Sequence, residues 1–199
     1  MQNIFSKYPF IKVYIDDLSI ASKSEAEHIE HIEVFFQVLK EHKLKLNPEK
    51  CNFFFSEIKL LGHIVDRTRI LMDMEKICAI QERKPPTNVK ELQSFLGATN
   101  FYRKFIQNYS KICAPLHKLT SAQVKWSWPI ECIEAFETLK KRLAEYPILR
   151  SPNFDLQFIV NTDASHTALG ASLSQVCPET GHEYACHFAS KLLKESERS

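Results

Sequence analysis

Two adjacent aspartates, Asp16 and Asp17, interrupt the mostly apolar stretch KVYIDDLSIAS, which begins at Lys12. Adjacent carboxylates repel each other, and a protein core does not accept them unpaired. Mg²⁺ prefers one or two carboxylates together with phosphate oxygens, so the pair has the chemistry of a magnesium site. Two such ions can activate a hydroxyl nucleophile and stabilise a leaving group. The alternative is a solvated hairpin turn, because Asp is common in turns.

The residues around the pair predict a β-hairpin followed by a helix. Residues 10–15 and 18–21 are rich in Ile, Val and Tyr, and they predict two short strands joined by the two aspartates. Ser24 and Glu27 have the spacing of a capping box, which predicts a helix start. Apolar residues then recur at three- and four-residue steps and predict one buried helix face, at Ile29, Ile32, Phe36 and Leu39.

The rest of the chain predicts a second strand pair, four helices and a final set of strands. Residues 51–65 predict the strand pair, in which Gly62 indicates a bulge or a close approach of the backbone. Helices are expected over residues 74–83, from about Asn88, over residues 112–119, and through four apolar positions up to Pro147 (Ile133, Phe136, Leu139 and Leu143). The segments DLQFIVNTDAS, ALGASLSQ and EYACHFAS then predict three consecutive strands of a second domain.

Composition is typical of a soluble globular protein and argues against a membrane-spanning or secreted one. Of 199 residues, 44% are hydrophobic and 25% are charged, and the net charge is only +2, so any basic surface must be local. No signal peptide or membrane-spanning run is expected, because no apolar stretch approaches about 20 residues. The six cysteines are scattered, which predicts reduced thiols in an intracellular, cytoplasmic or nuclear protein.

Four collinear segments carry a resemblance to a known family. YIDD, at residues 14–17, looks like the Y-x-D-D motif of reverse transcriptases. LNPEKCNFFFSEIKLLGHIV, at residues 46–65, resembles the end of the palm and the primer grip of gypsy-type retrotransposon polymerases. Residues 89–120 look like the thumb of that group, and residues 126–175 are similar to its passage into ribonuclease H. The resemblance therefore covers essentially the whole chain.

The resemblance implies an α+β fold in three parts. Residues 1–70 would be the C-terminal half of a polymerase palm, with the YIDD hairpin and the primer grip. Residues 71–150 would be a helical thumb and connector. Residues 151–199 would be the first three antiparallel strands of a ribonuclease H-like domain. The implied activity is RNA-directed DNA polymerisation, with Mg²⁺ as cofactor and an RNA or DNA template–primer duplex and a dNTP as partners.

The resemblance also assigns the acidic site residues. Asp16 and Asp17 match two of the three metal-binding aspartates of the palm, and Asp163 in VNTDAS matches the first acidic metal ligand of ribonuclease H. An isolated Asp163 would otherwise be an ordinary strand-end residue. The third palm aspartate and the later ribonuclease H acids are expected outside this chain, so we expect the chain alone to bind metal weakly and not to polymerise.

Nucleic-acid contacts are expected at the hairpin, the primer-grip turn and the first thumb helix. Tyr14 would place an aromatic face beside the aspartates. In LLGHIV, the turn would bring the backbone close to a primer end, because glycine removes a side chain that would collide. A glycine inside a helix costs about 1 kcal/mol of helix stability relative to alanine. The close approach of a duplex groove would explain why Gly97 stands in the expected thumb helix. The expected contacts are Tyr14, Leu61, Gly62, His63, Gly97, Asn100, Arg103 and Lys104, the last two with phosphates.

Two other hypotheses remain open. The chain could be a non-enzymatic nucleic-acid-binding or interaction protein derived from a retrotransposon. It could also be a small zinc protein, because Cys177, His182, Cys186 and His187 lie close together in sequence. Neighbouring residues on a strand point to opposite faces, which argues against Cys186 and His187 binding one ion.

Overall fold

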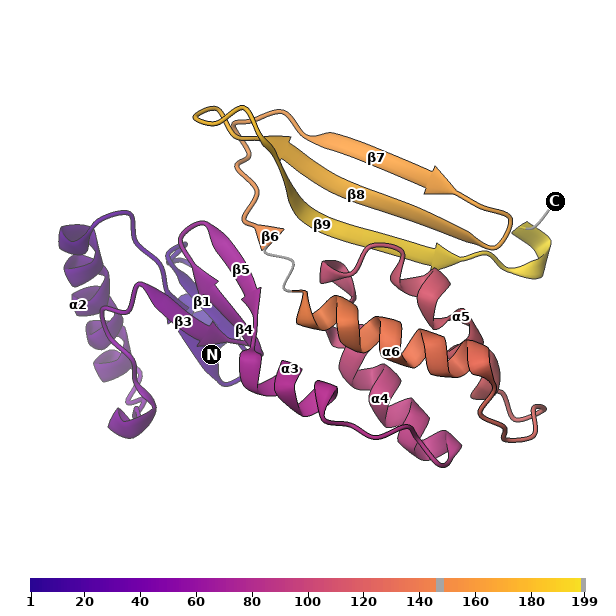
Figure 1. Cartoon of the computed structure of the whole chain (residues 1–199). Coiled ribbons are helices and arrows are strands. Elements are labelled where there is room, and N and C mark those ends of the chain that lie inside the picture. Colours follow the sequence, from indigo (N-terminus) through magenta and orange to yellow (C-terminus); the bar gives the residue numbers. More distant parts are fainter. Residues whose placement is uncertain (146–148, 198–199) are drawn as a thin grey trace. The chain divides into compact units, whose positions relative to one another are not determined.

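The computed structural model describes residues 1–145 and 149–197, and the chain divides into two compact units (Figure 1). The first unit is Met1–Phe55 and the second is Ser56–Ser199. The predicted division at residues 70 and 150 stays a prediction. Within the described residues, no helix combines the length and the apolar character needed to cross a membrane.

The first unit is a β-hairpin packed against one long helix. It contains helix α1 (Gln2–Phe5), strands β1 (Ile11–Tyr14) and β2 (Asp17–Ile20), helix α2 (Glu25–Glu41) and a short 3-10 helix η1 (Pro48–Lys50). A small apolar core joins them, made of Phe5, Ile11, Phe35, Val38 and Leu39. Both the hairpin and the capping box of the following helix are confirmed, because the Ser24 side chain accepts a hydrogen bond from the amide of Glu27.

The hairpin turn is shifted by one residue from its predicted position. Tyr14 pairs with Asp17, so the two-residue turn consists of Ile15 and Asp16, and Asp17 belongs to β2. Ile15 has a φ of 54°. A β-branched residue rarely adopts this left-handed conformation, which costs roughly 1–2 kcal/mol. Propensity alone would place such a turn on the two aspartates, and the cross-strand register overrides it.

Helix α2 buries a face that includes the predicted Leu39 but is otherwise rotated from the predicted one. Phe35, Val38 and Leu39 are buried, whereas Ile29 and Phe36 are 46% and 45% exposed. The helix has two adjacent apolar stripes, and the hairpin packs against the second. Phe36 instead lies near Phe53, with 6.1 Å between the ring centroids.

The second unit begins with a four-stranded antiparallel sheet. Its order is β3 (Glu57–Leu60), β4 (His63–Asp66), β5 (Arg69–Met72) and β6 (Leu149–Arg150). The strand pair predicted within residues 51–65 is confirmed as β3 and β4, but it starts later than Cys51: Phe54 has a φ of 59°, which breaks an extended conformation, and the first strand starts at Glu57. Strand β5 and the two-residue strand β6 were not predicted, and they pair through Ile70 and Leu149.

Four helices lie between β5 and β6 in sequence and enclose the main core. They are α3 (Met74–Gln81), α4 (Val89–Phe101), α5 (Tyr109–Leu119) and α6 (Ile130–Ala144), with the 3-10 helix η2 (Arg103–Phe105) after α4. All four predicted helices are confirmed, although the expected stop at Pro147 lies outside the described residues. Their inward faces form one apolar cluster, whose fully buried members include Ile77, Leu92, Phe95, Leu116, Phe136 and Leu139.

The three predicted final strands are confirmed as an antiparallel sheet. They are β7 (Ile159–Ala164), β8 (Ala168–Val176) and β9 (Glu183–Leu192), in that order, and a short 3-10 helix η3 (Glu195–Glu197) follows them. Figure 1 shows β9 as the strand next to α5. The buried side chain of Gln175 joins the sheet to the loop before it, because its amide bonds the backbone of Asn153 and the carbonyl of Leu156.

Candidate nucleic-acid interface

The two aspartates lie exposed at the tip of the β1–β2 hairpin. Asp16 occupies the turn and Asp17 is the first residue of β2. Tyr14 and Ile15 beside them are 56% and 76% exposed. Within the described residues, neither carboxylate forms an ion pair or a side-chain hydrogen bond, so both have free oxygen atoms for a cation.

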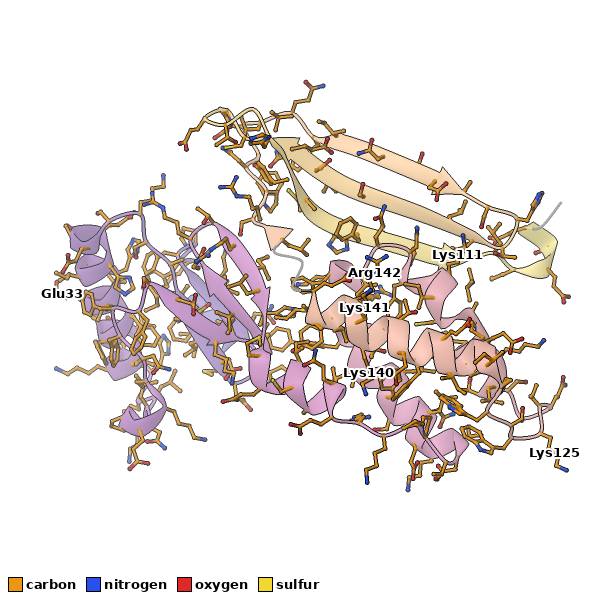
Figure 2. The ribbon with its side chains drawn as sticks, in the orientation of Figure 1. Glu33, Lys111, Lys125, Lys140, Lys141 and Arg142 are labelled. Atoms are coloured by element: carbon orange, nitrogen blue, oxygen red, sulfur yellow. The ribbon has the colours of Figure 1, made fainter. Side chains whose placement is uncertain are left out.

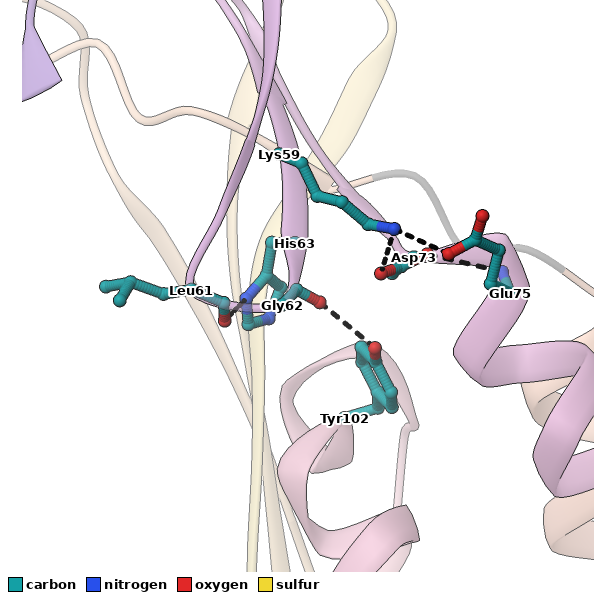
Figure 3. A network of polar contacts seen from close by, with 7 residues as sticks. All are labelled: Lys59, Leu61, Gly62, His63, Asp73, Glu75 and Tyr102. Atoms are coloured by element: carbon teal, nitrogen blue, oxygen red, sulfur yellow. Dashed lines mark hydrogen bonds and ion pairs between the residues drawn. The ribbon is translucent and has the colours of Figure 1, made fainter. Parts of the chain in front are cut away.

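The turn between β3 and β4 is fixed by a glycine and by the end of α4. Leu61 and Gly62 form the two-residue turn, with φ values of 49° and 75°, as a tight hairpin turn of this kind requires (Figure 3). The backbone carbonyl of Gly62 accepts a hydrogen bond from the Tyr102 hydroxyl at 3.0 Å. A Cβ atom on this glycine would lie 2.7 Å from Lys76 Nζ and 3.0 Å from Phe101 Cζ. The expected close approach at Gly62 therefore occurs within the chain itself.

His63 lies beneath this turn among aromatic rings. Its ring centroid is 4.9 Å from that of Phe101 and 5.8 Å from those of Tyr102 and Phe105. Nδ1 lies 3.1 Å from the carbonyl oxygen of Leu61, whereas Nε2 is buried and has no hydrogen-bond partner in the described structure. Burial, and then the charge of Lys104, lower the pKa of the imidazole. A neutral His63 with its proton on Nδ1 fits this geometry.

An ion pair and a buried cap hold the same sheet against α3. Asp73 is 2% exposed, and its side chain caps the helix by accepting from the amide of Glu75. Lys59 on β3 contacts both carboxylates, at 3.0 Å and 2.7 Å (Figure 3). The hydrogen bonds with these carboxylates raise the pKa of Lys59. These contacts fix where the sheet meets the helical part.

The four residues that were expected to contact nucleic acid from one thumb helix lie on two elements. Gly97 and Asn100 lie on the exposed side of α4, whose other side is buried. An added Cβ on Gly97 would meet no atom of the described residues within 4 Å, so close packing among them does not explain this glycine. Arg103 and Lys104 were expected on the same helix, but they lie in η2, after α4 has ended. Arg103 is exposed, whereas Lys104 is half-buried with its ammonium 5.3 Å from the Phe105 ring centroid.

Asp163 lies in the exposed strand β7, at the edge of the final sheet. It pairs with Gly170 of β8, and its carboxylate has no ion pair or hydrogen bond within the described residues. No three His, Cys, Asp or Glu side chains of the described chain gather into a metal-binding group. The four residues considered for zinc are therefore not brought together.

Two features of the candidate interface were not predicted from the sequence. Lys76 of α3 lies over the Phe101 ring, 5.4 Å from its centroid. His187 of β9 lies within the field of Lys104 and Arg103, and burial together with these two charges lowers its pKa. A count of charged residues over a local window would have indicated the basic character around Lys76, because residues 76–125 contain nine Lys or Arg residues and two Glu residues. Figure 2 labels two of them, Lys111 on α5 and Lys125 in the loop after it.

Two family descriptions match the two ends of the chain. Residues 1–65 match the family described as "Reverse transcriptase (RNA-dependent DNA polymerase)". Residues 128–199 match the family described as "RNase H-like domain found in reverse transcriptase".

Curated relatives resemble most of the chain but are much longer. The chain is 35% identical over 189 residues to the Transposon Tf2-3 polyprotein of Schizosaccharomyces pombe, a match of 95% of this chain and 14% of the relative. It is 41% identical over 186 residues to the Retrovirus-related Pol polyprotein from transposon 297 of Drosophila melanogaster, a match of 93% of this chain and 17% of the relative. The chain therefore spans about a sixth or less of these relatives.

Solved structures of a foamy viral protein share the fold. The structure of the foamy viral protease-reverse transcriptase in complex with RNA/DNA hybrid has a TM-score of 0.84 and 25% identity, and it covers the whole of this chain and 27% of that one. The same viral protein in complex with dsDNA has a TM-score of 0.84 and 25% identity, with 41% of that chain covered.

Proposed function

This chain belongs to the reverse transcriptase and ribonuclease H region of gypsy-type LTR retrotransposon Pol polyproteins, and from that premise we propose that its second unit binds an RNA/DNA or DNA template–primer duplex during RNA-directed DNA synthesis. Residues 1–70 would serve as the part of the palm that carries the metal site. Residues 71–150 would be the thumb and connector, and residues 151–199 the start of the ribonuclease H-like domain.

One observation carries the proposal for the duplex. The Gly62 carbonyl is bonded to Tyr102, so the β3–β4 turn, with its exposed Leu61, is held at the end of α4, directly before the basic helix η2. Backbone and basic side chains that converge in this way suit the sugar–phosphate backbone, which needs no base-specific contact. Gly97 and Asn100 would extend the surface along α4, because a residue without a side chain allows a nucleic-acid groove to approach closely.

Asp16 and Asp17 are the residues that would hold Mg²⁺ in the first unit. The donor set fits this ion in part, because it consists of two exposed carboxylates without ion-pair partners within the described residues. When bound, the metal would supply charge stabilisation for nucleotide transfer. Tyr14, which is 56% exposed, would offer a flat apolar face beside the carboxylates. Asp163 would have the corresponding metal-binding role in the ribonuclease H-like part.

Duplex binding can be tested with fluorescence anisotropy of a labelled RNA/DNA hybrid. We expect affinity to fall steeply as salt rises, because each neutralised phosphate releases counterions. The double variant Arg103→Ala/Lys104→Ala should lose affinity by about tenfold or more and reduce the salt dependence by the equivalent of about two contacts. The control, Lys45→Ala/Lys125→Ala, also removes two positive charges, and it should change affinity by less than about twofold.

The outcomes separate this function from the alternatives. Equal losses in both double variants would mean that only net charge matters, and they would count against the proposed surface. Absence of binding at low salt would overturn it. The family membership supports this reading over that of a non-enzymatic binding protein.

A further inference from the structure

Strand β9 is held against the beginning of α5 by a short network of serines. The amide of Ser110 donates to Ser190 Oγ at 2.8 Å, and the Ser110 hydroxyl donates to the Ser190 carbonyl at 2.9 Å. The two hydroxyl oxygens also lie 3.1 Å apart. Nearby, an added Cβ on Gly170 would lie 2.4 Å from the side-chain oxygen of Asn108, so β8 approaches the same segment closely. These contacts fix the final sheet relative to the segment that contains η2.

A group of basic side chains lies at this junction, and we name it the basic cluster: His63, Lys76, Arg103, Lys104 and His187. They come from β4, α3, η2 and β9. The charge of Lys104 acts on both histidines and lowers the pKa of each, with Lys76 contributing at His63 and Arg103 at His187. The helix η2 packs directly against β9, and the Lys104 ammonium lies over the Phe105 ring, which is itself next to the His63 ring.

The basic cluster has no acidic counterpart within the described residues. None of Lys76, Arg103 and Lys104 forms an ion pair there, whereas Lys59, Arg69 and Lys191 do. Lys104 is half-buried, so its ammonium is partly removed from water without a carboxylate among the described residues to compensate, and this burial lowers its pKa. Like charges gathered in this way are unfavourable in the free protein and favour the binding of an anion.

We infer that Arg103 and Lys104 of η2 and His187 of β9 form one binding site for a phosphodiester group of the duplex. This inference rests on the proposed function and adds a contact from the ribonuclease H-like part. His187 is exposed and can donate a hydrogen bond to a phosphate oxygen. The His63 imidazole lies below the site with a buried Nε2, so it senses the charge without touching the ligand. Thumb and final sheet therefore grip the duplex at a shared point.

The experiment uses the whole chain, an RNA/DNA hybrid of about 20 base pairs and the variants Lys104→Gln, His187→Gln and their double. Affinity is measured by anisotropy at several salt concentrations, and the imidazole resonances are followed by NMR. Lys104→Gln should weaken binding by about tenfold and lower the salt slope by about one contact, and His187→Gln should weaken it about threefold. The fold-loss of affinity in the double variant should be smaller than the product of the two single-variant losses, because both side chains act on one phosphate. Lys125→Gln is the matched control.

Two readouts separate this site from a structural role. Replacing Lys104 removes a repelling charge, so the pKa values of His63 and His187 should both rise in the free protein. The free energy of unfolding should not fall. Adding the hybrid to the unaltered chain should shift the His187 resonance strongly, whereas inorganic triphosphate at equal phosphate concentration should not.

If the unaltered chain does not bind the hybrid, the proposed function fails. If it binds, but Lys104→Gln and His187→Gln behave like Lys125→Gln, the shared site is wrong and the proposed function stands. Strict additivity of the two substitutions would also overturn a single shared phosphate. A His187 shift produced by triphosphate alone would assign the site to a free phosphate compound instead.

Discussion

The Tyr102 hydroxyl donates a hydrogen bond to the carbonyl oxygen of Gly62, at 3.0 Å and across 40 residues of sequence. Tyr102 is 1% exposed, so the bond is formed in a part of the unit that excludes water. It links the β3–β4 turn to the end of α4, which are the two segments proposed to face the duplex.

Removing this hydroxyl should loosen the turn. Tyr102→Phe leaves the Gly62 carbonyl without this donor, which should lower the free energy of unfolding by about 1 kcal/mol. Denaturant unfolding followed by circular dichroism measures the change. Tyr8→Phe is the control, because its hydroxyl has no hydrogen bond in the described structure. An equal effect of both substitutions would contradict the importance of the bond.

Adding a methyl group to Gly62 should be more damaging than adding one to Gly181. Both glycines have positive φ, 75° and 69°, so both substitutions strain the backbone. Only at Gly62 would the new Cβ also meet Lys76 and Phe101. We expect a loss of about 2 kcal/mol or more for Gly62→Ala and about 1 kcal/mol for Gly181→Ala. Thermal unfolding of the two variants tests this, and equal losses would show that the close approach is unimportant.

Gly97→Ala should separate stability from binding. The position is helical and open, so alanine should raise the free energy of unfolding by roughly 0.5–1 kcal/mol. The same substitution should weaken hybrid binding, since the added side chain stands where a groove would approach, and Gly97→Leu should weaken it further. Ser94→Ala, on another exposed position of α4, is the control and should leave binding unchanged. Unchanged binding in Gly97→Leu would exclude contact at this position.

The two aspartates should bind a divalent cation without affecting the fold. Mn²⁺ is a paramagnetic substitute for Mg²⁺ and should broaden the NMR signals of residues near Asp16 and Asp17. Asp16→Asn/Asp17→Asn should abolish this broadening and leave thermal unfolding unchanged, because both side chains are exposed. Asp155→Asn, another exposed aspartate, should leave the broadening intact. Persistent broadening in the double variant would remove the hairpin as a metal site.

Asp66 should make the second unit sensitive to acid. Hydrogen bonds from the Thr68 and Arg69 amides, and the Arg69 guanidinium, lower the pKa of its carboxyl to about 2 from 3.8. A depressed pKa means that the stabilisation is fully present above about pH 4 and is lost as pH falls towards 2. Asp66→Asn should therefore lower the midpoint of urea unfolding at pH 7, and the difference should shrink at pH 3. A constant difference would contradict the ionic contribution.

Local signals in the sequence sufficed for the helices of the second unit. Asn88 and Glu91 predicted the start of α4, and the Asn88 side chain does accept from the amide of Glu91. Helix caps depend on neighbours a few residues away, so they can be read without knowledge of the fold. The three final strands were likewise predicted from local segments that turn-like residues separate.

Features that depend on distant partners were not predictable in this way. The apolar residues 51–55 resemble a strand, but a strand needs a neighbour, and Phe53, Phe54 and Phe55 remain exposed. The turn at Ile15 was displaced because cross-strand register decides it. For the candidate site, residue types indicated Arg103 and Lys104, whereas His187 required the contact between β9 and η2. The roles of the site residues stay predictions.

The pairing of β5 with β6 bears on how the second unit folds. Ile70 and Leu149 are neighbours in the sheet, although the whole helical part of the unit lies between them in sequence. Closing a loop of this size carries a large entropic cost, and contacts of high sequence separation slow folding. The β3–β4 hairpin and the helices should therefore gain structure early. The two-residue strand β6 should be the last to dock and the first to detach, which makes it the natural place to look for the slow step of refolding.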